Sequence, residues 1–383
     1  MPLKRNQQKL LSFTAPEAAG FRLQRHHLLA AKSKPSDVVS ICRDICGAQA
    51  QLTTAAHLQL WSRNHALRRT DVESALWQDR SLVKSHMMRQ TLHLVPADDF
   101  ALYVAALKSC RVADALRIMR RFGISDEEGH SLTPLILDAL THGPLRRAEV
   151  TAAVRPKVSK RVQAWMARVW SIVRVPMAEG KVCYGSGEGN EVTLIRTDHW
   201  LKQQPAVEEE AARAELFRRY LRAYGPATLR DFAHWAGLPA PQVRPLQEAL
   251  QDGVCEVSVD GNPCLLLRAD LSSLEKAKTF SGSVRLLPHF DPYLLAHRAK
   301  DHLLASSHYK RVYRNQGWIS PVVLLDGEIA AVWSYKAKGR KLEVSVEPFR
   351  RFTRAVRERV TEEAEALAEF FNSSLEVEFM QAA

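Results

Sequence analysis

The spacing of apolar residues changes within the first hundred positions. Between Val38 and Ile45 apolar side chains recur every three or four residues, which predicts a helix. A second helix is expected from Thr53 and a third over residues 71–77. The runs "SLVKSHMM" and "TLHLV" are rich in strand-forming residues around a short connection, which predicts two strands. The expected order is helix, turn, helix, helix and hairpin.

This order of elements recurs twice further along the chain. The helical stretch "SLTPLILDAL" leads to "KVCYGSGEGNEVTLIR", which predicts two strands around a glycine-rich loop. The stretch "AELFRRYLRAYGPATLRDFAHWAGL" leads to the strands "VCEVSV" and "PCLLL". The pairs Gly143-Pro144 and Gly225-Pro226 mark the same step in both repeats. Since helix-turn-helix followed by a two-stranded wing is the winged-helix plan, we predict three tandem winged-helix units. A helical protein with incidental hairpins is the alternative.

After residue 280 the pattern changes to strands. Asp326-Gly327 lies between alternating apolar runs and predicts a hairpin, and a helix is expected over residues 354–371 before the short strand "SLEVEF". We therefore predict an α+β protein, with three tandem winged-helix units followed by a C-terminal β-rich, barrel-like domain. The predicted domain boundaries are 21–122, 123–204, 205–275 and 280–383.

The composition narrows the class of protein. The chain has 383 residues, enough for two to four domains, and 54 Lys and Arg against 42 Asp and Glu give a net charge of +12. This balance favours a polyanionic partner, nucleic acid first, although solvated basic faces are also common. No pair among the six cysteines has zinc-ligand spacing, so we expect a reduced, cytoplasmic protein without a metal. No signal peptide and no membrane-spanning segment are expected.

Two glutamines precede the helix that is expected from Thr53. Gln49 and Gln51 stand one residue apart in what is predicted to be an extended segment, so both side chains should face the same side. Each carboxamide offers donors and an acceptor, and two together can fix a water molecule and orient its lone pair. They cannot take the proton of that water well. The alternative is a polar turn with two surface glutamines.

Other candidate groups carry weaker signals. Asp98 and Asp99 resemble a carboxylate pair, but a helix follows them, and we expect one of them to cap it. His93 alternates with Leu92 and Leu94, so its side chain should point to the other face of the strand. That face is either a cleft or solvent, and solvent is the default expectation.

Several blocks of the sequence resemble, in order, the AlkZ/AlkX-like winged-helix DNA glycosylases. The blocks are "GAQAQLTTAAHLQLWSR", "RQTLHLVPADDF", "YLRAYGPATLRDFAHWAGL", "LLPHFDPYLLAHR" and "GWISPVVLLDGEIAAVW". The resemblance covers about residues 20–350. It implies three tandem winged helices plus a C-terminal β-rich domain. It also implies excision of N-alkylated purines, which in some family members include bulky adducts or interstrand crosslinks made by genotoxic natural products.

The resemblance assigns a role to the two glutamines. Gln49 and Gln51 match the family's catalytic glutamines, with Ala50 as the apolar residue between them. A sister branch has Asp in place of the second glutamine, so the chain is more similar to the AlkZ branch. Alkylation at purine N7 or N3 makes the base cationic, so it leaves without protonation by the enzyme. A monofunctional DNA glycosylase that leaves an abasic site, without metal or cofactor, is therefore expected.

Phosphate contacts are expected from Lys and Arg side chains around the bound DNA. The candidates are Arg22, Arg25, Lys84, Arg89, Lys310, Arg311 and Arg314. The tip Asp326-Gly327-Glu328 matches a C-terminal hairpin that family members use near the DNA, although its carboxylates suit phosphates poorly. The expected partner is double-stranded DNA carrying alkylated purines, bound by a monomer at the nucleoid.

Two other function classes remain open from the sequence. One is a non-enzymatic winged-helix DNA-binding protein, such as a transcriptional regulator, and the other is a structural scaffold. A regulator usually needs a dimer on symmetric half-sites, whereas three unequal units in one chain favour a monomer on an asymmetric lesion.

Overall fold

In the computed structural model the chain divides into two compact units. We call Pro35–Leu216 with Ala236–Leu238 the glutamine unit, and Met1–Lys34 with Phe217–Trp235 and Pro239–Ala383 the terminal unit. Both combine helices with sheets, so the predicted α+β class is confirmed. The structure describes residues 10–29, 37–168, 172–187, 192–250, 252–277 and 281–382.

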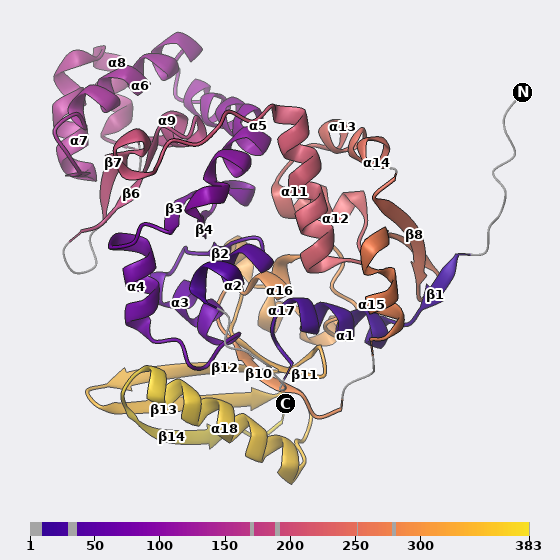
Figure 1. The fold of residues 1–383 in the computed structure, drawn as a ribbon. Helices are drawn as coiled ribbons and strands as arrows, with labels where there is room; N and C mark the ends of the chain where they lie inside the picture. Colours follow the sequence, from indigo (N-terminus) through magenta and orange to yellow (C-terminus); the bar gives the residue numbers. More distant parts are fainter. Residues whose placement is uncertain are drawn as a thin grey trace, which may run out of the picture. The chain divides into compact units, whose positions relative to one another are not determined.

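The glutamine unit contains a six-stranded antiparallel sheet. Two of the predicted hairpins are present, and the pairing of Lys84 with Tyr184 joins them into one sheet. Figure 1 shows β2, β4 and β3 side by side. In spatial order the strands are β2 (Ala48–Gln49), β4 (Leu92–Pro96), β3 (Leu82–His86), β6 (Val182–Gly185), β7 (Thr193–Arg196) and β5 (Leu145–Arg146).

Helices pack against this sheet through apolar faces. The three helices predicted before the first hairpin are present, and the Asp37 carboxylate caps the first of them by accepting the Ser40 N–H. A buried cluster that includes Ile41, Leu60 and Leu94 fixes these helices on β4. The helices are α2 (Val38–Asp44), α3 (Thr53–Trp61), α4 (Arg69–Trp77), α5 (Phe100–Arg120), α6 (Asp126–Ala139), α7 (Arg147–Val154), α8 (Lys160–Met166), α9 (Arg174–Ala178) and α10 (Thr197–Trp200), with short 3-10 turns η1 (Met88–Gln90), η2 (Ala97–Asp99) and η3 (Arg155–Lys157).

The terminal unit contains a three-stranded sheet with helices around it. Strand β1 (Leu11–Phe13) runs parallel to β8 (Val254–Val259), which pairs with β9 (Asn262–Leu267) as the third predicted hairpin. The helix α11 (Glu209–Tyr224) crosses the boundary between the two units. The other elements of this part are α1 (Ala15–Arg25), α12 (Leu229–Ala236), α13 (Ala240–Val243), α14 (Leu246–Ala249), η4 (Arg268–Asp270) and α15 (Leu271–Glu275).

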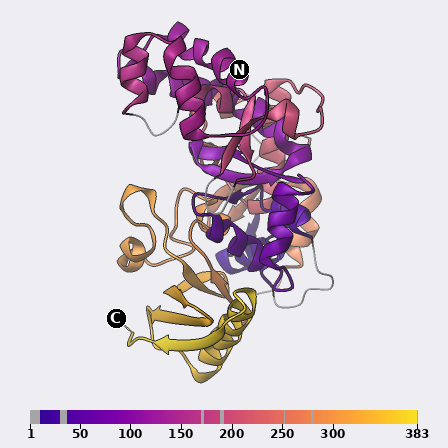
Figure 2. The same ribbon diagram turned by 90° about the vertical axis from the view of Figure 1, so that its left-hand side faces the viewer.

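The C-terminal part of the terminal unit is a five-stranded sheet covered by one helix. Figures 1 and 2 show α18 (Arg354–Phe370) along a face of this sheet, where the Glu363 carboxylate accepts from Arg285 and from the Leu286 N–H. The described strands form an open sheet and no closed barrel. The strands in order are β10 (Val284–Leu287), β11 (Val322–Leu325), β12 (Glu328–Lys338), β13 (Lys341–Pro348) and β14 (Ser374–Phe379), with α16 (Pro292–Leu295), η5 (Ser306–His308), α17 (Tyr309–Val312) and η6 (Asn315–Gly317) between β10 and β11.

The predicted helices and strands are largely confirmed, but the predicted arrangement of domains is not. The hairpins, the last helix and the last strand are confirmed, while the tip of the second hairpin, 188–191, lies outside the described residues. The three winged-helix units and their boundaries stay predictions. The expected barrel-like closure of the C-terminal domain is not found, because its described strands form an open five-stranded sheet. Within the described ranges, no helix is long and apolar enough to cross a membrane.

Candidate active site

The extended segment with the two glutamines lies along β4. Gly47 makes this approach possible: its φ is +95°, and a Cβ there would lie 3.0 Å from the Leu94 carbonyl oxygen. The chain then pairs Gln49 with His93, and the Ala50 N–H donates to the Leu92 carbonyl at 2.7 Å. The segment is therefore extended as far as Ala50, as predicted, whereas Gln51 lies in a bend just beyond the edge strand β2.

Gln49 is buried, and both its carboxamide and its backbone carbonyl are held by hydrogen bonds. Its side chain is 6% exposed, and Arg89 Nη2 donates to Gln49 Oε1 at 3.0 Å. The Gln59 side chain, on α3, donates to the Gln49 backbone carbonyl at 3.0 Å. Because the guanidinium uses the amide oxygen, the amide NH2 group and the second lone pair of that oxygen remain for another partner.

Gln51 is exposed, but its carboxamide is also held by its oxygen. The Leu92 backbone N–H donates to Gln51 Oε1 at 3.2 Å. Both amide oxygens therefore accept from the same short stretch, Arg89–Leu92, at the start of β4. Among the described residues, no carboxylate contacts either carboxamide. The pair can thus donate to and accept from a small ligand such as water, but it offers no strong base.

The turn that holds Gln49 has an unusual backbone. Arg89 and Gln90 have φ values of +52° and +59°, a region that side chains other than glycine and Asn rarely adopt. Gly237 packs directly on this turn, since a Cβ there would lie 3.0 Å from both Arg89 N and Arg89 Cα. The Gln90 side chain donates to Asp114 at 2.6 Å. These contacts fix the position from which Arg89 reaches Gln49.

His93 does not point to solvent, so the default expectation for it was wrong. The side chain is 2% exposed on the same face as Gln49, and its Nδ1 lies 2.9 Å from the Thr91 carbonyl, to which it donates. Burial, helped by the nearby Arg89 charge, lowers the His93 pKa to about 3. The imidazole next to Gln49 is therefore neutral at ordinary pH and leaves Nε2 as an acceptor.

Lys84 lies on the other face of the sheet. It pairs with Leu94, one position from the pair of Ser85 with His93, so its side chain points away from the glutamine side chains. It is 6% exposed, its Nζ donates to Thr53 Oγ1 at 3.3 Å, and burial lowers its pKa. In this structure the ammonium group thus lies at the start of α3.

Three predicted phosphate-binding arginines of the terminal unit already have protein partners. Arg22 is 5% exposed and donates to the Ala18 carbonyl, Arg25 pairs with Asp270, and Arg311 pairs with Glu347 at 3.2 Å. Lys310 and Arg314 are exposed, and no ion pair involves either among the described residues.

The predicted DNA-contacting hairpin tip is partly covered. The Asp326 carboxylate accepts from the N–H groups of Gly282 and Ser283, and Gly327 packs 3.0 Å from Ala19 as measured from an added Cβ. Glu328 is exposed. Contact of any of these residues with DNA stays a prediction.

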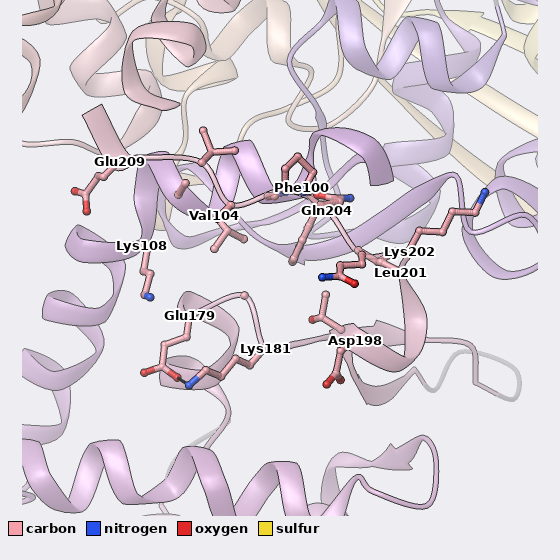
Figure 3. Close-up of a pocket in the computed structure, with 18 of the residues that line it drawn as sticks. Phe100, Val104, Lys108, Glu179, Lys181, Asp198, Leu201, Lys202, Gln204 and Glu209 are labelled. Atoms are coloured by element: carbon pink, nitrogen blue, oxygen red, sulfur yellow. Dashed lines mark hydrogen bonds and ion pairs between the residues drawn. The ribbon is translucent and has the colours of Figure 1, made fainter. Parts of the chain in front are cut away.

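A large cavity of the glutamine unit does not include the glutamines. It has a volume of about 920 Å³ and lies between α5, α10 and residues 201–209 (Figure 3). Gln204 anchors that segment, because its Oε1 accepts the Ala101 N–H at 2.7 Å. The acids at its rim have partners, such as Asp198 with Arg196 at 2.7 Å. No reactive pair of side chains meets in this cavity in the part of the chain described.

The aspartate pair Asp98-Asp99 does not cap the helix α5 as expected. Asp99 occupies the first cap position of α5, but its carboxylate makes no capping bond and pairs instead with Arg43 at 3.1 Å. The expected cap was therefore wrong, because the arginine on α2 competes for the carboxylate. Among the described residues, no group of three or more His, Cys, Asp and Glu side chains is arranged to hold a metal ion.

Comparisons with known proteins relate the whole chain to DNA-repair glycosylases. The chain is 32% identical over 323 residues to an interstrand DNA cross-link repair glycosylase of Streptomyces sahachiroi, which covers 82% of this chain and 85% of that protein. The structure of the present chain also matches the solved structure of the Streptomyces sahachiroi DNA glycosylase AlkZ. That match has a TM-score of 0.84 and 27% identity, and it covers 97% of this chain and all of the solved chain.

The family is defined more directly by a sequence model. A model described as "DNA glycosylase AlkZ-like" matches residues 42–370, most of the chain. The chain belongs to this family of DNA glycosylases, and the resemblance noted from the sequence blocks is confirmed. The matched region includes Gln49, Gln51 and Arg89, so the site built above lies within the family's shared part.

Proposed function

We propose that this protein hydrolyses the N-glycosidic bond of N-alkylated purines in double-stranded DNA, with N7-alkylguanine and N3-alkyladenine as the substrate class. The observation that carries the proposal is the pair of carboxamides whose oxygens are anchored on Arg89 and Leu92. A cationic purine needs no general acid in order to leave. A site that orients water without a strong base suits this reaction.

The proposed step uses the glutamines to position water. The C1′–N bond breaks and its electron pair neutralises the cationic purine, while the water oxygen forms a bond to C1′ and loses its proton to solvent. Gln49 and Gln51 hold this water through their free amide groups and lone pairs, and Arg89 keeps Gln49 oriented. The products are a free base and an abasic site in an uncut strand, as expected of a monofunctional glycosylase.

The relative from Streptomyces sahachiroi suggests that the lesion is large. That protein is named for interstrand cross-link repair, and we extend this substrate class to the present chain. Gln51 supports the extension because it is exposed in a bend just beyond the edge strand β2 rather than enclosed in a tight pocket. We further infer three winged-helix units that bind the duplex as a monomer, with a C-terminal β-rich domain.

Duplex DNA carrying N7-methylguanine tests the proposal. We expect release of free base in a single turnover, with strand breaks that appear only after alkali treatment. Binding without release of base would favour a regulator instead. Strand cleavage without alkali would contradict the monofunctional mechanism. A duplex crosslinked through two purines then tests the larger substrate class, because unhooking restores the mobility of separated strands.

A further inference from the structure

The terminal unit contains a basic cavity that the proposed chemistry at Gln49 and Gln51 does not use. It lies around α17 and η6, where a cavity of about 520 Å³ is lined by Tyr313, Asn315, Trp318 and two cations, Lys310 and Arg314. A second cavity of about 390 Å³ shares Lys310 and Arg314 and continues toward β12. Volumes of this size are typical of sites for small molecules and cofactors.

The indole of Trp318 packs against two neighbouring rings. It makes T-shaped contacts with the rings of His289 and Phe290, with a centroid distance of 5.1 Å in each case, and Trp318 is 38% exposed. The loop that carries it is closed by the Arg314 N–H, which donates to the Trp318 carbonyl at 2.8 Å. His289 is fixed in turn, with Nδ1 2.7 Å from the Ile319 carbonyl. A large aromatic side chain is therefore presented partly to solvent on a fixed support, at a cost in apolar exposure.

The charges around Trp318 favour an anion. Lys310 and Arg314 are exposed and form no ion pair within the described ranges, whereas the acid that lines the second cavity, Glu347, pairs with Arg311 at 3.2 Å. The basic cavity therefore combines an aromatic surface with two available cations. Aromatic stacking next to basic side chains is the combination with which proteins bind unpaired nucleotides.

We propose that this basic cavity binds one unpaired nucleotide of a DNA strand, with the base stacked on Trp318 and the phosphates held by Lys310 and Arg314. The inference deepens the proposed function, since an unhooked or distorted duplex leaves bases without partners. It assigns the terminal unit a role in recognising distortion that is separate from the chemistry at Gln49. It predicts a preference for distorted DNA even when no alkylated base is present.

Lesion-free DNA tests this without reference to excision. The full chain is titrated with a paired duplex and with the same duplex carrying one bulged nucleotide, read by anisotropy. We expect the bulged duplex to bind on the order of 10-fold more tightly, the scale of one base stacked on an aromatic ring. Trp318→Ala should remove this difference, and Trp318→Phe should keep most of it. Phe122→Ala, at an exposed aromatic residue of the glutamine unit, is the control and should keep all of it.

A second probe reports on the stacked base itself. With 2-aminopurine at the bulge, its fluorescence should fall on binding to the wild-type protein and change much less with Trp318→Ala. Free dAMP and inorganic phosphate should bind far more weakly than the bulged duplex. Equal affinity for bulged and paired duplexes, an equal loss for both with Trp318→Ala, or dAMP binding as tight as the bulged duplex would overturn the assignment. Failure of base excision leaves these measurements unaffected, so the two proposals fail separately.

Discussion

Gln49 and His93 lie directly opposite each other on β2 and β4, and they point to the same face of the sheet. The Ala50–Leu92 hydrogen bond lies one position away, so the Gln49–His93 pair is one in which side chains approach closely. Because the imidazole is neutral and its Nδ1 donates to the Thr91 carbonyl, its Nε2 is left as a hydrogen-bond acceptor. A neutral histidine of this kind can orient water but takes up its proton poorly.

This pair predicts a flat pH profile for excision. The His93 pKa is lowered to about 3, and the nearby His86 pKa to about 4, so neither group changes charge between pH 5.5 and 8. Single-turnover release of N7-methylguanine should vary less than about 3-fold over this range, as expected when no general base titrates. A rate that falls tenfold below pH 6.5 would mean that His93 or another base takes the proton.

Removal of either glutamine amide should slow excision. Gln49→Ala or Gln51→Ala should lower the single-turnover rate by roughly 10–10³-fold, the range for a lost orienting hydrogen bond. Gln51→Asp should keep partial activity, since a carboxylate also holds water. The double alanine variant should be little worse than the poorer single variant if the two side chains act as one unit. Wild-type rates in both single variants would show that the pair is a polar turn.

The two substitutions should differ in their effect on folding. Gln51 is exposed, so Gln51→Ala should leave the free energy of unfolding within about 0.5 kcal/mol of the wild-type value. Gln49 is buried and accepts from Arg89, so Gln49→Ala should cost about 1–2 kcal/mol because the guanidinium loses a partner. Urea unfolding measures both. Equal stability of the two variants would contradict the arrangement described here.

The sequence predicted the extended strand at Gln49 but not what holds it. Alternation and the neighbouring helix start predict the direction of the two side chains. The fixed position of Arg89 depends instead on positive φ values at Arg89 and Gln90 and on the packing of Gly237, which lies about 150 residues away in sequence and has no local signal. His93 was misjudged for a similar reason. Its alternation with Leu92 and Leu94 gave the correct face, but burial of that face depends on distant chain segments.

Buried neutral histidines should make stability depend on pH. The pKa values of His57 and His86 are lowered to about 4, and that of His93 to about 3, by burial. The unfolded chain takes up protons at these sites near pH 6.5 while the folded chain does not. The free energy of unfolding therefore has its full value above that pH. It should fall on acidification from pH 7 to 5, by at most about 1.4 kcal/mol per histidine and pH unit. Denaturant midpoints measure this, and a midpoint that rises toward pH 5 would contradict it.

Binding of undamaged duplex DNA should depend strongly on salt. The net charge of +12 favours phosphate contacts, and if about six phosphates are neutralised, log K against log salt should have a slope near −5. Lys310→Ala and Arg314→Ala should each make this slope less negative by about 1, because both side chains are exposed. Lys84→Ala should leave it unchanged, because that ammonium group is buried against Thr53. A loss of slope with Lys84→Ala would show that Lys84 leaves its buried position on binding.

Substitutions of Arg89 distinguish two roles of this side chain, which either positions Gln49 or contacts a DNA phosphate. If it acts by holding Gln49 Oε1, Arg89→Ala should lower the single-turnover rate at saturating enzyme by roughly 10-fold or more and leave the salt slope of binding unchanged. Arg89→Lys should recover part of the rate, since an ammonium group also donates but reaches the amide less rigidly.

Combined with Gln49→Ala, Arg89→Ala should add almost nothing, because its partner is already absent. If Arg89→Ala instead weakens DNA binding, reduces the salt slope by about 1 and leaves the saturated rate unchanged, then Arg89 contacts a phosphate in the complex and Gln49 is oriented by the sheet alone.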